Sequence, residues 1–152
     1  NLFISETKIR FEVTNISLTS KLIDGTFPDY ERVIPKTNTK IMTVKTHDFA
    51  SSIDRVATIS SDKSKAVKFA INNNSLTLTV INPDAGTAVE KVDVSYEADD
   101  LEVGFNARYL LDIASQISGD TMTFTLEDPG APALINDSAH EDATYVLMPM
   151  RV

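Results

Sequence analysis

Apolar and polar residues alternate along the first part of the chain in the manner typical of β-strands. Every second residue is apolar in residues 8–13, and a similar alternation runs through residues 16–22. Thr14 and Asn15 lie between the two runs and favour a turn. The pattern therefore predicts an antiparallel β-hairpin near the start of the chain.

A stretch rich in turn-forming residues follows this hairpin. It contains Gly25, Pro28 and Pro35. The residues between the two prolines are expected to be extended and irregular, because proline disfavours helical conformation in the residue before it. We therefore place a domain boundary in this stretch.

Beyond the boundary, the pattern predicts one strand, one helix and three further strands. Residues 40–45 favour a strand, and Thr46 is a candidate N-cap for a helix with Asp48 in its first turn, where a negative charge suits the helix dipole. The apolar face of this helix is formed by Phe49, Ile53, Val56 and Ala57. Strands are then expected at residues 66–71, 76–81 and 88–96.

The same order of elements is predicted a second time. Residues 101–105 favour a strand, Asn106 is a candidate N-cap, and Gly119 is expected to end the helix that follows. The apolar stripe of this helix is Ala107, Leu110, Leu111, Ala114 and Ile117. Strands are expected at residues 121–126, 133–136 and 144–148. The fold class is therefore predicted to be α+β, with two βαβββ units that place two antiparallel sheets against two helices.

Composition and charge exclude several classes of protein. The chain has 152 residues, a formal net charge of −8 and no cysteine, so disulfide frameworks and thiolate metal sites are excluded. No apolar run approaches the ~20 residues of a membrane-spanning helix, and no signal-peptide pattern occurs. We therefore expect a cytoplasmic protein with no membrane association. Its negative field argues against tight, sequence-specific binding in a DNA groove.

Candidate catalytic and metal-binding residues are few. His47, Asp48 and Asp54 lie close together in the sequence, but no G-x-S-x-G pattern supplies a serine nucleophile. His47 and His140 are the two histidines, and neither has the spacing of a metal-ligating pair. No glycine-rich phosphate-binding loop occurs. We therefore expect no metal and no cofactor. A small hydrolase that uses His47, Asp48 and scattered serines is the weakest functional hypothesis.

The last eight residues and two acidic regions are the features that most suggest binding. Met148 and Met150 flank Pro149, and flexible, polarisable methionines are typical of adaptable binding surfaces. Taken alone, these residues slightly favour a buried terminal strand, with the methionines filling space in the core, over a binding surface. Acidic residues gather at 84–102 and 127–142, most simply as a solvated rim, although Asp84 and Glu90 could attract a basic partner.

Three separate motifs in the chain are distinctive. They are LIDGTFPDYERVIP at residues 22–35, VGFNARYLLD at residues 103–112 and YVLMPMRV at residues 145–152. The first resembles the stretch between the second and third domains of the bacterial DNA polymerase III beta subunit, or sliding clamp. The second resembles the start of that family's last inner helix, and the third resembles its C-terminus. The motifs occur in the family's order.

This resemblance implies a DNA-clamp fold and a role in DNA replication. Residues 1–30, the hairpin and linker, would be the C-terminal end of the second clamp domain, and residues 31–152 would be a complete third domain. Family members are non-catalytic processivity factors, head-to-tail homodimeric rings that encircle double-stranded DNA without sequence specificity. The residues implied at the dimer interface are Thr58, Ile59, Asp84 and Glu90.

The family also binds short peptides of DNA polymerase III and clamp-loader subunits in a hydrophobic pocket near the C-terminus. Carried over residue by residue, the matching positions are Pro28, Arg32, Val33, Asn106, Tyr109, Val146, Met148, Pro149, Met150 and Arg151. Methionine and proline would receive a Leu or Phe of the peptide, and arginine would meet its Gln. The chain departs from the family at Ser64, Gly130, Pro132 and Val152, which bears on peptide preference. A stand-alone peptide-binding adaptor is the alternative function.

Overall fold

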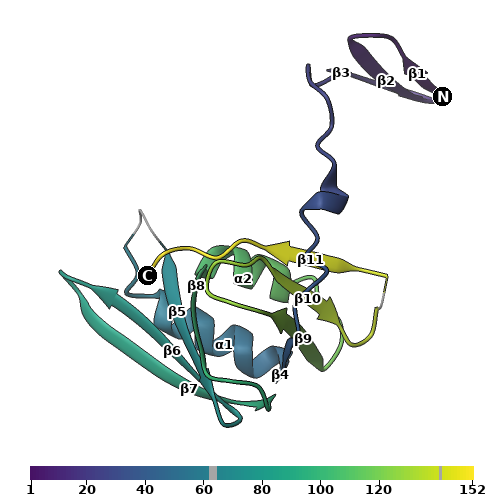
Figure 1. The fold of residues 1–152 in the computed structure, drawn as a ribbon. Helices are drawn as coiled ribbons and strands as arrows, with labels where there is room; N and C mark the ends of the chain where they lie inside the picture. Colours follow the sequence, from purple (N-terminus) through teal and green to yellow (C-terminus); the bar gives the residue numbers. More distant parts are fainter. Residues whose placement is uncertain (62–64, 141) are drawn as a thin grey trace. The chain divides into compact units, whose positions relative to one another are not determined.

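The chain forms two compact units, Asn1–Tyr30 and Glu31–Val152, in a computed structural model. The structure describes residues 1–61, 65–140 and 142–152. Figure 1 labels the helices and strands of both units.

The first unit is a three-stranded antiparallel sheet in the order β1 (Leu2–Ile4), β2 (Lys8–Val13) and β3 (Ile16–Lys21). The β2–β3 pair is the predicted hairpin, with Val13 opposite Ile16 beside the turn. β1 was not predicted, because three consecutive apolar residues show no alternation. Many apolar side chains of this sheet are exposed, since the unit contains no helix to cover either face.

The second unit contains the order βαβββ twice, as predicted. A short 3-10 helix, η1 (Tyr30–Arg32), lies where the first unit ends and the second begins, so the stretch between the two prolines is not extended throughout. The first repeat is β4 (Lys40–Lys45), α1 (Thr46–Ala57), β5 (Ala66–Asn72), β6 (Ser75–Asn82) and β7 (Gly86–Tyr96). The second is β8 (Leu101–Asn106), α2 (Ala107–Ala114), β9 (Thr121–Leu126), β10 (Ala133–Asp137) and β11 (Thr144–Leu147). The predicted α+β class is confirmed.

The first strand of each repeat pairs with strands of the other repeat. β4 pairs with β9 along its whole length, and β8 pairs with β5. Each resulting group of four strands is antiparallel. The pairing of β4 with β7, from Met42↔Tyr96 to Val44↔Val94, joins the two groups into one eight-stranded sheet. The two predicted sheets are therefore continuous with each other.

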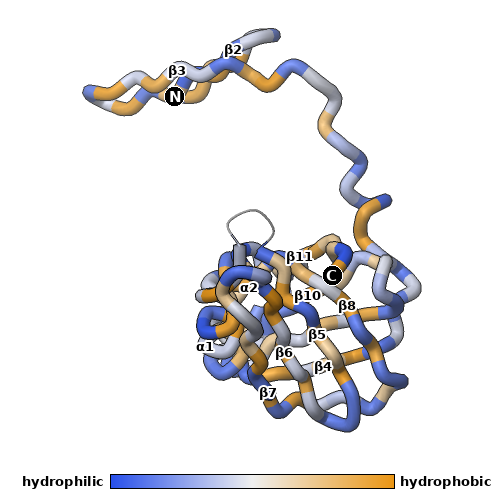
Figure 2. Tube along the Cα trace, turned by 90° about the vertical axis from the view of Figure 1, so that its left-hand side faces the viewer, coloured by the Kyte–Doolittle hydropathy of each residue, from blue (hydrophilic) through white to orange (hydrophobic). Residues whose placement is uncertain are grey.

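Both helices lie on one face of this sheet (Figure 2). The hydrophobic core lies between the helices and the sheet. Phe69 of β5 is at the centre of an aromatic cluster. Its ring centroid lies 5.9 Å from that of Phe49, 5.2 Å from that of Phe105 and 6.3 Å from that of Phe124. These four side chains come from α1, β5, β8 and β9 and are fully buried. One core therefore serves both repeats.

The N-termini of the two helices are capped differently. Asn106 caps α2 as predicted, since its Oδ1 accepts a hydrogen bond from the backbone N–H of Arg108 at 2.9 Å. Thr46 does not cap α1, and that prediction is wrong. Lys45 occupies the N-cap position, and the Thr46 hydroxyl donates instead to the carbonyl of Gly119 at 2.9 Å.

Gly119 does not end α2, contrary to the prediction, because the helix already ends at Ala114. It lies instead in a turn organised by the buried carboxylate of Asp137. The Asp137 oxygens accept hydrogen bonds from the backbone N–H groups of Ser118, Gly119 and Ala139 at 2.8, 3.0 and 2.8 Å. The hydroxyl of Ser118 donates a fourth, at 3.1 Å. These donors lower the pKa of Asp137.

Candidate functional site

The C-terminal tail, residues 148–152, follows β11 and crosses β8. The backbone N–H of Met150 donates to the carbonyl of Gly104 at 2.8 Å, which forms an isolated antiparallel bridge. β8 is the last strand of the eight-stranded sheet, so its outer edge is open to this bridge. The tail therefore adds one short bridge to the β8 edge of the sheet.

A surface hollow runs along this tail. Its lining residues are Lys68, Glu102, Val103, Gly104, Pro129, Gly130, Met148, Pro149, Met150, Arg151 and Val152. Met148 is 57% exposed, while Pro149 and Met150 are half-buried. An exposed methionine beside a hollow does not fit the core-filler interpretation and is accessible to a partner.

The structure brings together four of the residues carried over for peptide binding: Met148, Pro149, Met150 and Arg151. The other residues carried over do not line this hollow: Pro28, Arg32, Val33, Asn106, Tyr109 and Val146. Tyr109 and Val33 are exposed, and Val146 lies in β11 opposite Leu134. Pro28 belongs to the first unit. Ser64 lies outside the described residues.

The strand side of the hollow was not predicted. Lys68 of β5 and Glu102 of β8 lie on this side, and their side chains form an ion pair with Nζ 2.8 Å from Oε2. Gly104 also lies there, and a glycine between the apolar residues Val103 and Phe105 of a strand is the signal that could have indicated a close approach of another segment.

Comparison with known proteins supports the recognition of the three motifs. Residues 31–151 match the family model described as DNA polymerase III beta subunit, C-terminal domain. The chain belongs to this beta subunit family. The beta sliding clamp of Caulobacter vibrioides is 51% identical over the whole of this chain, which covers 41% of that relative. The beta sliding clamp of Pseudomonas aeruginosa is 34% identical over 99% of this chain, which again covers 41% of the relative.

Solved sliding clamps share the fold. The crystal structure of the DnaN sliding clamp from Bartonella birtlesii, bound to griselimycin, superposes with a TM-score of 0.92 and 52% identity. The match covers 99% of this chain and 41% of that clamp. The sliding clamp of Caulobacter crescentus gives the same TM-score at 51% identity. The DNA-clamp fold expected from the motifs is therefore confirmed, and the chain spans well under half the length of these relatives.

The residues that the sliding-clamp resemblance places at the dimer interface lie near the end of α1. Thr58 is the C-cap residue of α1. The carbonyl of Ile59 accepts a hydrogen bond from Asn82 Nδ2 at 2.7 Å, and Asn82 Oδ1 accepts one from the backbone N–H of Asp84 at 3.0 Å. Asn82, which was not predicted, therefore connects Ile59 with Asp84.

Glu90, the fourth residue of that set, lies on β7. β7 pairs with β6 through residues 86–93, but β4 pairs with it only from Val94 onward. Within the described part of the chain, residues 86–93 thus have no strand partner on their second edge. The Glu90 carboxylate accepts hydrogen bonds from Arg55 Nε at 2.6 Å and Nη2 at 2.8 Å, which lower the pKa of Glu90.

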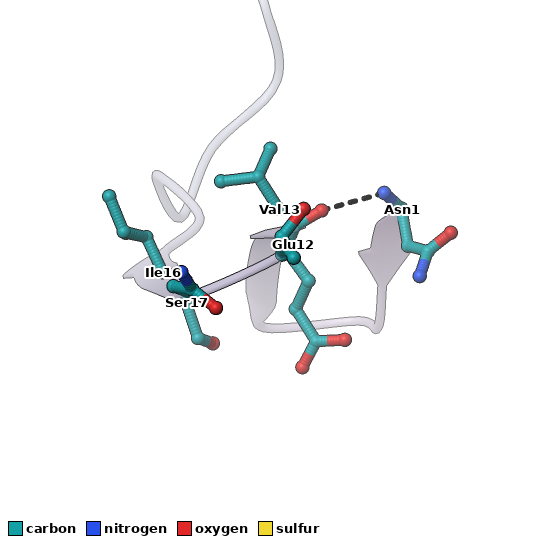
Figure 3. Close-up of a pocket in the computed structure, with 7 residues that line it drawn as sticks. Asn1, Glu12, Val13, Ile16 and Ser17 are labelled. Atoms are coloured by element: carbon teal, nitrogen blue, oxygen red, sulfur yellow. Dashed lines mark hydrogen bonds between the residues drawn. The ribbon is translucent and has the colours of Figure 1, made fainter.

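Two other regions of this clamp-family chain were candidates for a catalytic or ligand-binding site, and neither has the features that such a site needs. A hollow in the first unit lies where the amino group of Asn1 donates to the Glu12 carbonyl at 2.8 Å (Figure 3). Glu12 is the one ionisable side chain in its lining, and it is paired with Arg10. His47 is 92% exposed, with Nδ1 3.5 Å from Asp48 Oδ1, so the pair is not desolvated as a catalytic dyad requires.

The described residues contain no group of three or more His, Asp or Glu side chains that could hold a metal ion. Their helices are too short to cross a bilayer, since even α1 has only 12 residues.

Proposed function

We propose that this chain is the C-terminal part of a bacterial sliding clamp, with residues 1–30 ending the second domain and residues 31–152 forming the third. In the whole protein it would be part of a non-catalytic ring that encircles DNA. The ring would tether DNA polymerase III and clamp-loader subunits through short peptides bound near the C-terminus. The observation that carries this proposal is the hollow beside the exposed Met148, in a chain whose residues 31–151 match the family.

The chemistry of the hollow suits a peptide with apolar and polar side chains. Met148 and Pro149 offer apolar surface for a Leu or Phe. Arg151 is an exposed cation at the rim and can donate to the carbonyl oxygen of a Gln side chain. Anchoring one or two apolar side chains in this way is how small interfaces concentrate their binding energy.

Truncation of Met148 tests the peptide site. Met148→Ala should weaken binding of a short peptide with Gln followed by Leu and Phe at least roughly tenfold, because loss of an anchor costs on the order of 2 kcal/mol. Deleting the last five residues should abolish binding. The measurements are peptide affinity by fluorescence anisotropy and the free energy of unfolding by urea titration.

Ile41 provides a matched control, because it is also 57% exposed but lies on β4, outside the hollow. Ile41→Ala should leave peptide affinity unchanged, and neither variant should lose the ~2 kcal/mol of stability that a truncated core residue loses. Unchanged affinity in both Met148→Ala and Arg151→Ala would show that the site is wrong.

The free edge of β7 supports a role for this region in ring closure. An exposed edge can accept a strand from a second molecule. Glu90 belongs to this edge strand, and Asp84 lies in the turn that leads into it. A cation of the partner would have to compete with Arg55 for Glu90. Residues 1–152 span only 41% of the curated relatives, and closing a ring needs a complementary surface for that edge, so we expect this stretch by itself to be a monomer in analytical ultracentrifugation. A stable closed ring formed by the chain alone would contradict this arrangement.

The surface between α1 and α2 supports weak contact with DNA. Arg108 and Lys65 line the depression between these helices together with Asp54 and Asp112, so positive and negative charges are balanced. A ring holds DNA topologically and needs little affinity for phosphate. Electrophoretic mobility shifts at moderate salt should show no submicromolar, sequence-specific binding by this chain; such binding would argue against the clamp proposal.

A further inference from the structure

β8 has a glycine where the C-terminal tail crosses it. Gly104 is buried, and it is not among the residues with a positive φ, so the backbone conformation itself does not require glycine. Glycine weakens the interior of a strand and commonly marks a place where another segment approaches closely. A reason for Gly104 must therefore be sought in its surroundings.

The tail occupies the space that a side chain at position 104 would need. A Cβ on Gly104 would collide with Cγ1 of Val152 and would lie 2.8 Å from its Cγ2 and 2.6 Å from the carbonyl oxygen of Met150. Separations of this size are well inside van der Waals contact. The Met150 oxygen is a backbone atom of the residue whose N–H bonds to Gly104, so it cannot move away without breaking that bridge.

Gly104, Met150 and Val152 therefore form a compact contact, which we call the tail anchor. β11 ends at Leu147, and the tail beyond it is tied to β8 by the bridge at Met150 and by the packing of Val152 over Gly104. Met148 and Pro149 lie between these two fixed points, β11 and the anchor. Their position along the hollow thus depends on both.

We propose that Gly104 is a positioning residue for peptide binding. By lacking a side chain, it allows the tail anchor to form, and the anchor holds Met148 and Pro149 against the hollow. Gly104 acts through the tail, by the position that the anchor gives to Met148 and Pro149. This inference rests on the proposed function of the hollow. It assigns Val152 a role in holding the tail rather than in peptide recognition.

The test compares a substitution at the tail anchor with one on β4, outside the hollow. Gly104→Ala introduces the collisions described above, whereas Ile41 is exposed and does not line the hollow. Hydrogen exchange at the Met150 amide reports the anchor, and exchange in β5 and β9 reports the core. Affinity is measured with a fluorescein-labelled peptide carrying Gln followed by Leu and Phe.

Gly104→Ala should speed exchange at Met150 and weaken peptide binding, each about tenfold, with exchange in β5 and β9 unchanged. Ile41→Ala should change neither quantity by more than about twofold. A merely structural role of Gly104 would move core exchange as well. Should Gly104→Ala not fold, deletion of Val152 removes one side of the anchor without touching β8 and should give the same two changes in weaker form.

Two results would overturn the inference: unchanged exchange at Met150 in Gly104→Ala, or faster exchange with unchanged peptide affinity. Failure of the proposed function gives a different result, because the unaltered chain would then bind no peptide at all. In that case the role of Gly104 in positioning the peptide site is refuted together with the proposed function. Exchange at the Met150 amide would still show whether Gly104 holds the tail.

Discussion

At the scale of single residues, Asp137 shows how backbone N–H groups and a hydroxyl accommodate a buried charge. It is 4% exposed, and four hydrogen-bond donors surround its two oxygens. Because these donors favour the ionised form, the pKa of Asp137 lies below the value of ~3.9 of an unfolded chain. The turn at residues 118–119 therefore depends on this carboxylate being ionised.

The stability contributed by Asp137 should depend on pH. A group whose pKa is lower in the folded state stabilises the protein above its unfolded pKa, and this contribution is lost as the pH falls through the folded value. Asp137→Asn should lower the free energy of unfolding at pH 7, and the difference from the unaltered chain should shrink below about pH 4. Urea titrations at pH 7, 5 and 3 measure it; a difference that stays constant with pH would contradict the assignment.

Phe69 is the residue on which the core should depend most. Phe69→Ala removes three ring contacts and leaves a cavity between the two repeats, so it should destabilise the chain by about 3–5 kcal/mol. Ile41→Thr, at an exposed position of β4, should change stability by less than ~0.5 kcal/mol. Denaturant unfolding followed by circular dichroism compares them, and similar losses would mean that the aromatic cluster is not the core.

At the scale of elements, predictions held where the determining contacts are local. The Asn106 cap involves a residue two positions away, and the hairpin of β2 and β3 closes over a two-residue turn. Thr46 failed as a cap because its hydroxyl bonds to Gly119, which is distant in sequence. The hollow was predicted on its tail side, where the motif is contiguous. The strand side depends on the crossing at Gly104; a glycine within a strand indicates a close approach, but it does not specify which segment crosses there.

Removing the cap of α2 should have a measurable cost. Asn106→Ala leaves the N–H of Arg108 without its side-chain acceptor and should lower the free energy of unfolding by ~1 kcal/mol. Asn106→Ser retains an acceptor and should lose much less. Equal losses in the two variants, measured by urea titration, would show that the cap is not what stabilises this helix end.

At the scale of the whole molecule, the two units should differ in independent stability. The second unit has its own core, whereas the first is a small sheet with exposed apolar side chains, and such sheets are marginal alone in water. Deleting residues 1–30 should shift the Tm of the remainder by no more than about 4 °C, which corresponds to ~1 kcal/mol. A peptide of residues 1–30 should show no cooperative transition by circular dichroism.

The exchange of first strands between the two repeats has a consequence for synthesis. β4 leaves the ribosome before residues 46–120, but its full-length partner β9 follows only after them. At about 5–20 residues per second, β4 waits on the order of 4–15 s for that partner. During this interval the apolar side chains of Ile41, Met42 and Val44 lie between two lysines, Lys40 and Lys45, at the ends of the strand. Charges in these positions disfavour aggregation of the unpaired strand with a neighbouring nascent chain.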